Sequence, residues 1–310
     1  MENIRYREAR ECDLEGFMDC LISVYGTDSY YTRFYDLDYV RGRLGRIFIA
    51  ERHGEVIGTL VLSDWGYEGR DHELSTFTVR RGLSGDHVGG ALLRYTLEKI
   101  GSRIPSVKGA NVTHHTASQI LTERNAFHPT GLLFGVFRDK SALLLILRNH
   151  SVRAVGRLFV PEALLSAAER VYRMFGVSFL PERRSADVAA PETCDIWYEH
   201  DAHFQYADVY ILSYGSDCAA RVAEIEAVCA QPDLTMNLFI DMRSPNAPLA
   251  YEALLDEGCV YAGFMPLSEA HEYIILHRPC GKPIRYDAMR LTEDSARTLR
   301  ALGVDLGEAQ

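Results

Sequence analysis

The sequence has no segment long and apolar enough to cross a lipid bilayer. Its longest apolar run is ALLLIL at 142–147, whereas a membrane-spanning helix needs about 20 such residues. The N-terminal stretch MENIRYREARECD is charged and has no apolar centre, which is unlike a signal peptide. These features predict a soluble, cytoplasmic protein.

Paired cysteines and an excess of basic residues are also missing. The chain has 7 cysteines in 310 residues, none of them in CxxC spacing, which predicts free thiols in a reducing compartment and no metal site. Its 33 Lys and Arg face 43 Asp and Glu, for a net charge of −10. A general nucleic-acid binder would need basic patches, so we expect neither a nucleic-acid nor a membrane partner.

Hydrophobic and polar residues are arranged as in a folded α/β protein. Up to about residue 150, the patterns predict the order strand, helix, three strands, helix, strand, helix, strand. A His53-Gly54 pair between two apolar runs predicts a hairpin, Asp13 is expected to cap the first helix, and Thr116 with Gln119 suggests a capping box. The predicted strands lie at 3–9, 46–52, 55–65, 72–80, 106–113 and 130–137, and the helices at 13–26, 88–100 and 116–127.

A glycine-rich loop stands between the strand HELSTFTVR and the helix that follows it. The stretch 80–100, RRGLSGDHVGGALLRYTLEKI, contains four glycines within nine positions and then turns helical. Bare backbone at a helix N-terminus is suited to binding an anion, most often a phosphate. Arg80 and Arg81 could add cationic partners. The alternatives are a purely structural turn and ordinary solvated arginines.

This order of elements, with its glycine loop after the fourth strand, resembles the GNAT superfamily of acyl-CoA-dependent N-acyltransferases. The family pattern is a valine that ends the strand, a short turn, and then Arg/Gln-x-x-Gly-x-Gly/Ala. Here Val79 ends the strand, RRGL is the turn, and SGDHVG occupies the motif, with Ser84 and His87 in place of the leading Arg/Gln and the first glycine. The resemblance covers roughly residues 1–140. It implies a mixed α/β fold with a central sheet splayed after the fourth strand.

The resemblance also implies a binding site and a catalytic site. Acetyl-CoA is the default co-substrate, and no metal is expected. The residues implied to hold it are Phe77, Thr78, Val79, Ser84, Gly85, Asp86, His87, Val88, Gly89 and Gly90.

Acyl transfer to an amine requires a base, because an alkylammonium has a pKa of about 10.4. Glu73 occupies the place where many family members carry a general-base Glu, although a solvated strand-end carboxylate is an equal alternative. The family's usual acid, a Tyr, is replaced by Thr122. His115 and Ser118 lie nearby and are candidate substitutes, while surface histidines remain the alternative.

The second half of the chain contains a partial repeat. NAFHPTGLLFG at 125–135 aligns without a gap with EGCVYAGFMPL at 257–267, so that Gly131 matches Gly263. The counterpart of the glycine loop has only Gly215. We therefore expect a GNAT domain at 1–150, a helical connector and linker at 151–190, and a degenerate GNAT-like domain at 191–310 that binds no CoA. Accidental similarity of two short segments is the alternative.

These observations predict an N-acyltransferase that moves an acyl group directly to an amine of a small molecule or peptide. Direct transfer is favoured since no cysteine occupies a motif position. The other hypotheses are a non-catalytic acyl-CoA sensor or scaffold and a ligand-free interaction module. A homodimer is left open. Tyrosines that could line an aromatic acceptor pocket, or pack against the second domain, are Tyr25, Tyr30, Tyr31, Tyr35 and Tyr39.

Overall fold

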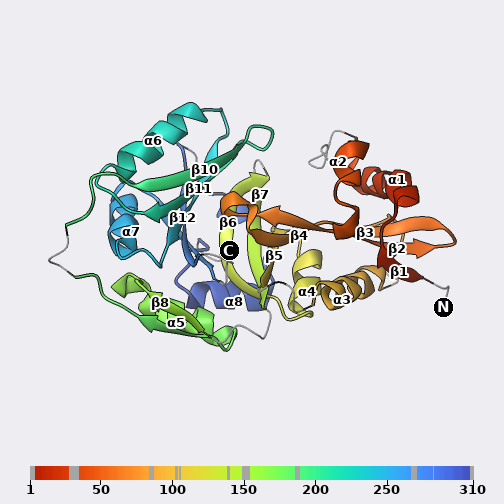
Figure 1. The fold of residues 1–310 in the computed structure, drawn as a ribbon, viewed down its shortest axis with the longest axis horizontal. Coiled ribbons are helices and arrows are strands. Elements are labelled where there is room, and N and C mark those ends of the chain that lie inside the picture. Colours follow the sequence, from red (N-terminus) through yellow and green to blue (C-terminus); the bar gives the residue numbers. More distant parts are fainter. Residues whose placement is uncertain are drawn as a thin grey trace. The chain divides into compact units, whose positions relative to one another are not determined.

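The chain folds into two compact units. The computed structural model describes residues 4–27, 35–83, 87–101, 104, 106–137, 140–148, 154–185, 189–266, 271–281 and 283–307. The units comprise Met1–Val107 and Lys108–Gln310 and are drawn in Figure 1. Each mixes helices with strands, which confirms the predicted α/β class. The predicted boundaries near residues 150 and 190 stay a prediction.

The first unit contains an antiparallel sheet in sequential order. Its strands are β1 (Arg5–Glu8), β2 (Ile47–Arg52), β3 (Glu55–Trp65) and β4 (Asp71–Val79). Its helices are α1 (Leu14–Tyr25), α2 (Leu37–Arg41) and α3 (Val88–Ile100). The predicted hairpin is confirmed between β2 and β3, since His53 and Gly54 both have positive φ, 54° and 81°, as a two-residue hairpin turn requires.

Asp13 precedes α1 as expected, but its side chain does not cap that helix. The carboxylate accepts the backbone N–H of Arg10 at 2.7 Å and two N–H groups of Arg7. The hydrogen bonds from Arg7 are the largest cause of a lowered pKa for Asp13. The prediction of an N-cap was wrong because a cation on β1 lies within reach of the carboxylate.

The second unit contains one long sheet in the order β5-β7-β6-β13-β14-β12-β11-β10. Its strands are β5 (Ser106–Val112, most of which belongs to this unit), β6 (His128–Phe137), β7 (Lys140–Arg148), β10 (Asp195–Asp201), β11 (Tyr206–Ser213), β12 (Thr235–Asp241), β13 (Val260–Met265) and β14 (Tyr273–Arg278). A separate pair joins β8 (Ala154–Leu158) to β9 (Ser178–Pro181). The helices are α4 (Ala117–Glu123), α5 (Leu165–Met174), α6 (Cys218–Val228), α7 (Ala247–Asp256) and α8 (Glu293–Ala301).

The sequence repeat corresponds to a repeat of elements. The order β4-α3-β5-α4-β6-β7 recurs as β11-α6-β12-α7-β13-β14. In the second unit's sheet, β6-β7-β5 runs to one side of the centre and β13-β14-β12 to the other. At the centre, Gly131 of β6 pairs with Gly263 of β13. The two glycines that align in the sequence therefore meet in the structure.

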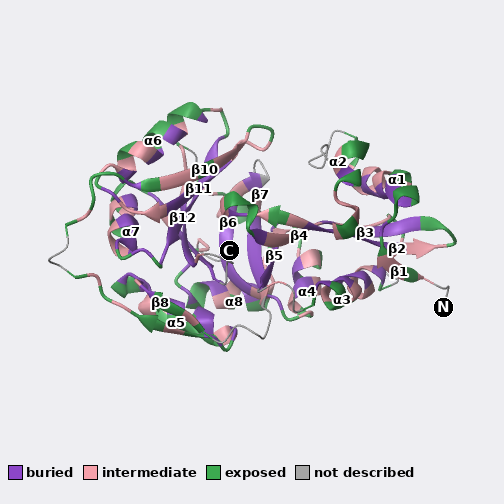
Figure 2. Ribbon diagram, in the orientation of Figure 1, coloured by how far each residue is buried: buried purple, intermediate pink, exposed green. Residues whose placement is uncertain are grey.

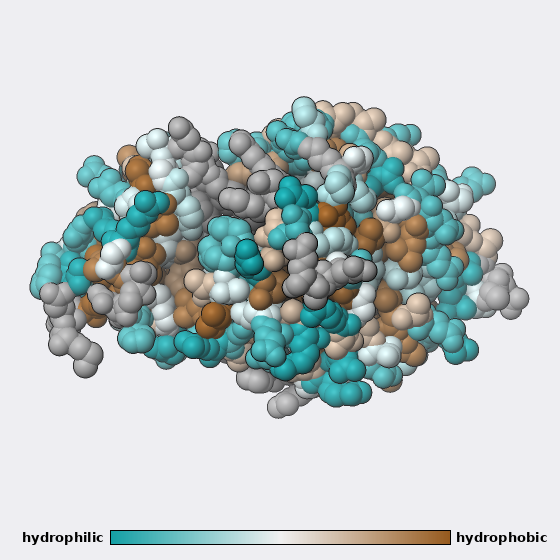
Figure 3. Space-filling model, turned by 180° about the vertical axis from the view of Figure 1, so that it is seen from behind, coloured by the Kyte–Doolittle hydropathy of each residue, from teal (hydrophilic) through white to brown (hydrophobic). Residues whose placement is uncertain are grey.

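The buried residues follow the sheets. In Figure 2 the strands β11 and β12 are largely buried, whereas α6 exposes one side. Hydrophilic and hydrophobic residues alternate over the face seen in Figure 3. All seven cysteines are free thiols, as predicted. Among the described residues, no helix has the length and apolarity needed to span a membrane.

Gly263 has a conformation that other residues rarely adopt. Its φ is +121°, and a Cβ placed on it would lie 2.5 Å from the Cα of Gly131. We predict that Gly263→Ala lowers the free energy of unfolding by about 2–4 kcal/mol, since it adds both a backbone clash and conformational strain. Urea denaturation measures this.

The matched control is Gly109→Ala in β5, where the added Cβ would make only ordinary contacts at 3.8 and 4.0 Å. Equal stability of the two variants would show that the β6–β13 approach imposes no constraint.

Candidate functional site

The glycine loop leads directly into α3. His87 immediately precedes the helix and has φ 57° and ψ 13°, the left-handed conformation. That conformation costs a non-glycine residue about 1–2 kcal/mol, whereas a glycine adopts it readily. Val88 is buried, and a Cβ on Gly58 of β3 would lie 3.4 Å from its side chain. The helix start is thus packed tightly onto the sheet.

The first turn of α3 presents backbone donors. The N–H of Ala91 donates to the carbonyl oxygen of His87, the residue before the helix, at 3.1 Å. Within the described part of the chain, no acceptor takes the N–H groups of Val88, Gly89 and Gly90. These groups and the helix dipole can bind an anion. Ser84, Gly85 and Asp86, also predicted to bind the cofactor, lie outside the described residues.

Strand β4 contains a bulge beside this loop. The register with β3 passes from Thr78 opposite Thr59 to Ser75 opposite Val61, so β4 has one extra residue. Thr76, within the bulge, is buried and has φ 48°. A bulge leaves backbone groups without a ladder partner and is common beside active sites. This feature was not predicted, because no sequence signal marked a non-glycine residue at positive φ.

The three β4 residues predicted to bind the cofactor have different surroundings. Thr78 is buried and its hydroxyl lies 2.6 Å from that of Thr59. Phe77 and Val79 are half-buried. Thr78 therefore supports the strand through its side chain, while Phe77 and Val79 retain exposed surface.

The two arginines of the loop already have protein partners. Arg80 forms an ion pair with Glu55, and Arg81 donates to the carbonyl of Val24 at 3.1 Å. Both anchor the loop to neighbouring segments of the first unit. Binding of a phosphate by either arginine would therefore compete with these contacts.

Glu73 lies on β4 opposite Ser63 and is half-buried. The position is six residues before the end of β4 at Val79. A half-buried carboxylate keeps access to solvent and can accept a proton through water.

His115 and Ser118 lie in the second unit, where β5 leads into α4. His114 and His115 are both exposed, and their ring centroids are 4.4 Å apart. The Ser118 hydroxyl oxygen is buried and makes no hydrogen bond within the described part of the chain. The structure therefore brings an exposed imidazole pair and a buried hydroxyl to one helix start.

Thr122 is not available as a proton donor. Its hydroxyl accepts from the Asn111 side chain at 2.7 Å and lies 3.0 Å from the carbonyl oxygens of Ser118 and Gln119. It is also buried. The replacement of the family's Tyr at this position thus leaves a hydroxyl that is fully engaged in the fold.

The predicted capping box of α4 is wrong. Thr116 makes no side-chain cap, and Gln119 is fully buried with its amide directed to backbone carbonyls of Val112, His115 and Arg290. Gln119 is held by a distant segment of the chain, which local pattern reasoning could not reveal.

In the C-terminal repeat, the segment that corresponds to the glycine loop forms hydrogen bonds with other residues of the chain. Just before α6, the N–H of Ser216 donates to Pro191 O at 2.9 Å and that of Asp217 to Glu192 O at 3.2 Å. The Asp217 carboxylate accepts the N–H of Cys194 at 2.7 Å. A Cβ on Gly215 would overlap the backbone of residues 193 and 194. Backbone carbonyls and a carboxylate occupy the place where an anion would bind.

The thiols beside this segment are poor nucleophiles. Burial raises the pKa of Cys194 to about 11 and that of Cys218 to about 12. Both thiols therefore stay protonated near neutral pH, as expected of buried structural cysteines.

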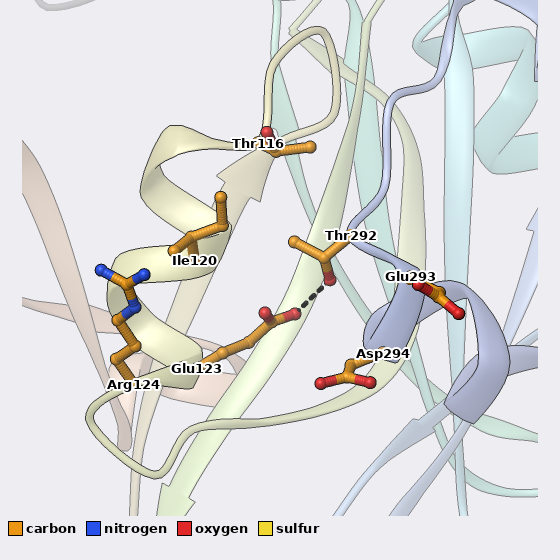
Figure 4. A pocket seen from close by; sticks show the side chains of 7 residues that line it. All are labelled: Thr116, Ile120, Glu123, Arg124, Thr292, Glu293 and Asp294. Atoms are coloured by element: carbon orange, nitrogen blue, oxygen red, sulfur yellow. Dashed lines mark hydrogen bonds between the residues drawn. The ribbon is translucent and has the colours of Figure 1, made fainter.

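An open pocket of about 550 Å³ lies between α4 and the start of α8. Figure 4 shows Ile120 and Glu123 of α4 facing Thr292, with a hydrogen bond from Thr292 to Glu123. Its lining residues are Thr116, Ile120, Glu123, Arg124, Thr292, Glu293 and Asp294. Sequence patterns did not predict this pocket, because α8 was not predicted.

A family model and several solved structures match the chain. Residues 13–125 match the model of the acetyltransferase (GNAT) family. This range includes β4, the glycine loop, α3, and the loop that carries His114 and His115. No curated protein matches the chain.

Two of the matching solved structures are N-acetyltransferases. One, an N-acetyltransferase from Staphylococcus aureus Mu50, is 18% identical with a TM-score of 0.40, and the match covers 47% of this chain and 99% of that chain. The other, a ribosomal-protein-alanine N-acetyltransferase from Brucella melitensis, is 23% identical with a TM-score of 0.39, covering 46% and 99%. The likeness to the family rests on the match of residues 13–125 to the family model.

Gly89 tests the anion site. We predict that Gly89→Val weakens acetyl-CoA binding by at least about tenfold, or 1.4 kcal/mol, because a β-branched side chain crowds the backbone donors. Calorimetric titration measures the affinity. Gly45→Val is the matched control, since a Cβ there meets nothing within 4 Å and its φ is unstrained. Unchanged affinity in Gly89→Val would exclude the loop from the site.

Proposed function

We propose that this chain, whose residues 13–125 match the model of the acetyltransferase (GNAT) family, transfers the acetyl group of acetyl-CoA directly to an amine of a small molecule or peptide. The observation that carries the proposal is the open N-terminus of α3 after a bulged β4. Among the described residues, the N–H groups of Val88, Gly89 and Gly90 have no acceptor, and a helix N-terminus of this kind stabilises a pyrophosphate.

Binding of acetyl-CoA is assigned to β4 and the glycine loop. The N–H groups of residues 84–90 are proposed to hold the pyrophosphate. Phe77 and Val79, which are half-buried, are proposed to contact the pantetheine arm. The bulge around Thr76 directs backbone donors out of the ladder, and such donors stabilise the oxyanion that forms when the thioester is attacked.

Proton transfer is assigned to three residues. Glu73 is proposed as the base that takes a proton from the acceptor ammonium through water. His115, exposed on its loop, is proposed as a compensating base or acid. Ser118 is proposed to donate to the departing thiolate, since its buried hydroxyl is not engaged within the described part of the chain and Thr122 is.

Direct transfer is favoured over an acyl-cysteine intermediate. Cys20 lies close to the proposed site, with its sulfur 3.8 Å from the hydroxyl oxygen of Thr78. Burial is the largest cause of a raised pKa for Cys20. A thiol that stays protonated is a weak nucleophile, so the amine itself is proposed to attack the thioester.

The C-terminal repeat is proposed to bind no CoA. The donors before α6 are taken by Pro191 and Glu192, and Asp217 adds a negative charge at the helix start. A phosphate would have to displace three hydrogen bonds and approach a carboxylate. One acetyl-CoA site per chain follows from this assignment.

A non-catalytic acyl-CoA sensor is the second candidate. The observation that favours it is the engaged hydroxyl of Thr122, which replaces the family's acid. A sensor would bind acetyl-CoA without consuming it in the presence of any amine.

Glu73→Gln separates catalysis from binding. We predict that this variant lowers the acetyl-transfer rate by about a hundredfold and flattens its rise with pH, while acetyl-CoA affinity changes less than twofold, because the lost carboxylate acts on the acceptor. Rates are followed by CoA release with a panel of amines, and affinity by calorimetry. Glu98→Gln, on an exposed position of α3, is the matched control.

A second pair of variants, His115→Ala and His114→Ala, assigns the imidazole. If the rise of the acetyl-transfer rate with pH is lost in His115→Ala but kept in Glu73→Gln and His114→Ala, His115 is the base instead of Glu73. Full rates in both Glu73→Gln and His115→Ala would refute the site assignment.

A further inference from the structure

The chain segment before α8 is hydrogen-bonded to the loop that carries His115. Arg290 N donates to Thr113 O at 2.5 Å, and Thr292 N donates to the Gln119 side-chain oxygen at 3.2 Å. The Gln119 side-chain nitrogen donates in turn to Arg290 O at 2.8 Å. Segments 171 and 173 positions apart in the sequence are thus joined through one amide side chain.

The side-chain amide of Gln119 also contacts two backbone carbonyls of the segment that joins β5 to α4. Gln119 is fully buried, and its nitrogen also lies 2.9 Å from His115 O and 3.2 Å from Val112 O. Gln119 therefore links Val112, at the end of β5, to His115, which precedes the N-cap of α4. An amide is needed here, because the nitrogen must donate to carbonyls while the oxygen accepts from Thr292.

A second contact fixes α8 against α4. The Glu123 carboxylate accepts from Thr292 Oγ1 at 2.5 Å and from the Ser295 hydroxyl. Thr292 is itself the N-cap of α8 and accepts the N–H of Ser295 at 3.1 Å. Figure 4 shows the carboxylate of Glu123 directed from α4 toward Thr292.

The imidazoles of this loop lie at the protein surface. His114 and His115 are exposed, so burial does not fix their orientation. The carbonyl of His115 is held by Gln119, and Ser118 directly precedes Gln119 in α4. Displacement of a reacting group by about 1 Å can cost a hundredfold in rate.

We propose that Gln119 is a positioning residue, and that the segment from Arg290 to Ser295 holds the His114–Ser118 loop in its working geometry. The inference rests on the proposed function. It gives the C-terminal half a part in the reaction, although that half is proposed to bind no CoA of its own. The segment acts through the backbone of the loop and touches neither substrate.

Gln119→Met tests the inference in the full-length chain. It keeps the length of the side chain but removes all of its hydrogen bonds. We expect kcat for acetyl transfer to fall about tenfold or more, while KM for acetyl-CoA changes less than twofold. We also expect faster amide hydrogen exchange in residues 113–118. Leu299→Ala is the control, since it removes a buried side chain of α8 and loses stability without touching the loop.

Arg290→Pro provides a second test that leaves the buried amide intact. It removes the N–H that donates to Thr113, and Met289 already has the extended conformation that a following proline requires, φ −85° and ψ 137°. Arg290→Ala keeps that N–H, and Arg290 is exposed. The proline variant should lose kcat and the alanine variant should not.

The outcomes separate the two proposals. The positioning role alone is overturned if the wild type transfers acetyl groups and the Gln119→Met and Arg290→Pro variants behave like their controls. A wild type that acetylates no amine overturns the proposed function and the positioning role with it. A fall in kcat with unchanged hydrogen exchange in 113–118 would also contradict the inference, because the loop would then not have been released.

Discussion

The close approach of Gly131 and Gly263 is the constraint on which the second unit depends. Only residues without a side chain allow β6 and β13 to pair at this point, with Gly263 at φ +121°. From this pair the sheet extends through β7 and β5 on one side and through β14 and β12 on the other. The chain that leaves β14 then returns to α4, where α8 packs against β6 and Arg290 meets Thr113. The C-terminal repeat is thereby built into the support of the His115 loop.

The starts of α3 and α6 occupy corresponding places in the repeat but differ in their hydrogen bonding. At the start of α3, His87 has a left-handed conformation, and within the described part of the chain the N–H groups of Val88, Gly89 and Gly90 have no acceptor. Before α6, the N–H groups of Ser216 and Asp217 donate to Pro191 and Glu192, and Asp217 adds a carboxylate. Since helix N-termini attract anions only when their N–H groups are free, the difference lies in local hydrogen bonding and not in the arrangement of strands and helices.

The sequence predicted the features that depend on local patterns. The hairpin at His53-Gly54, the helix after the glycine loop and the matching glycines 131 and 263 all follow from spacing and turn chemistry. Features that depend on distant segments were missed. Gln119 suggested a capping box but binds Arg290, and the carbonyls that accept at the α6 start belong to Pro191 and Glu192, which precede β10. The bulge at Thr76 depends on a non-glycine residue at positive φ, for which the sequence carries no signal.

Of the two related helix starts, that of α3 is proposed to bind acetyl-CoA and that of α6 is not. Native mass spectrometry of the full chain, titrated with acetyl-CoA to saturation, measures this stoichiometry directly. We expect one molecule bound per chain, at α3. Two bound molecules would show that the start of α6 opens to a ligand despite its internal hydrogen bonds, and none would show that the glycine loop serves only as a turn.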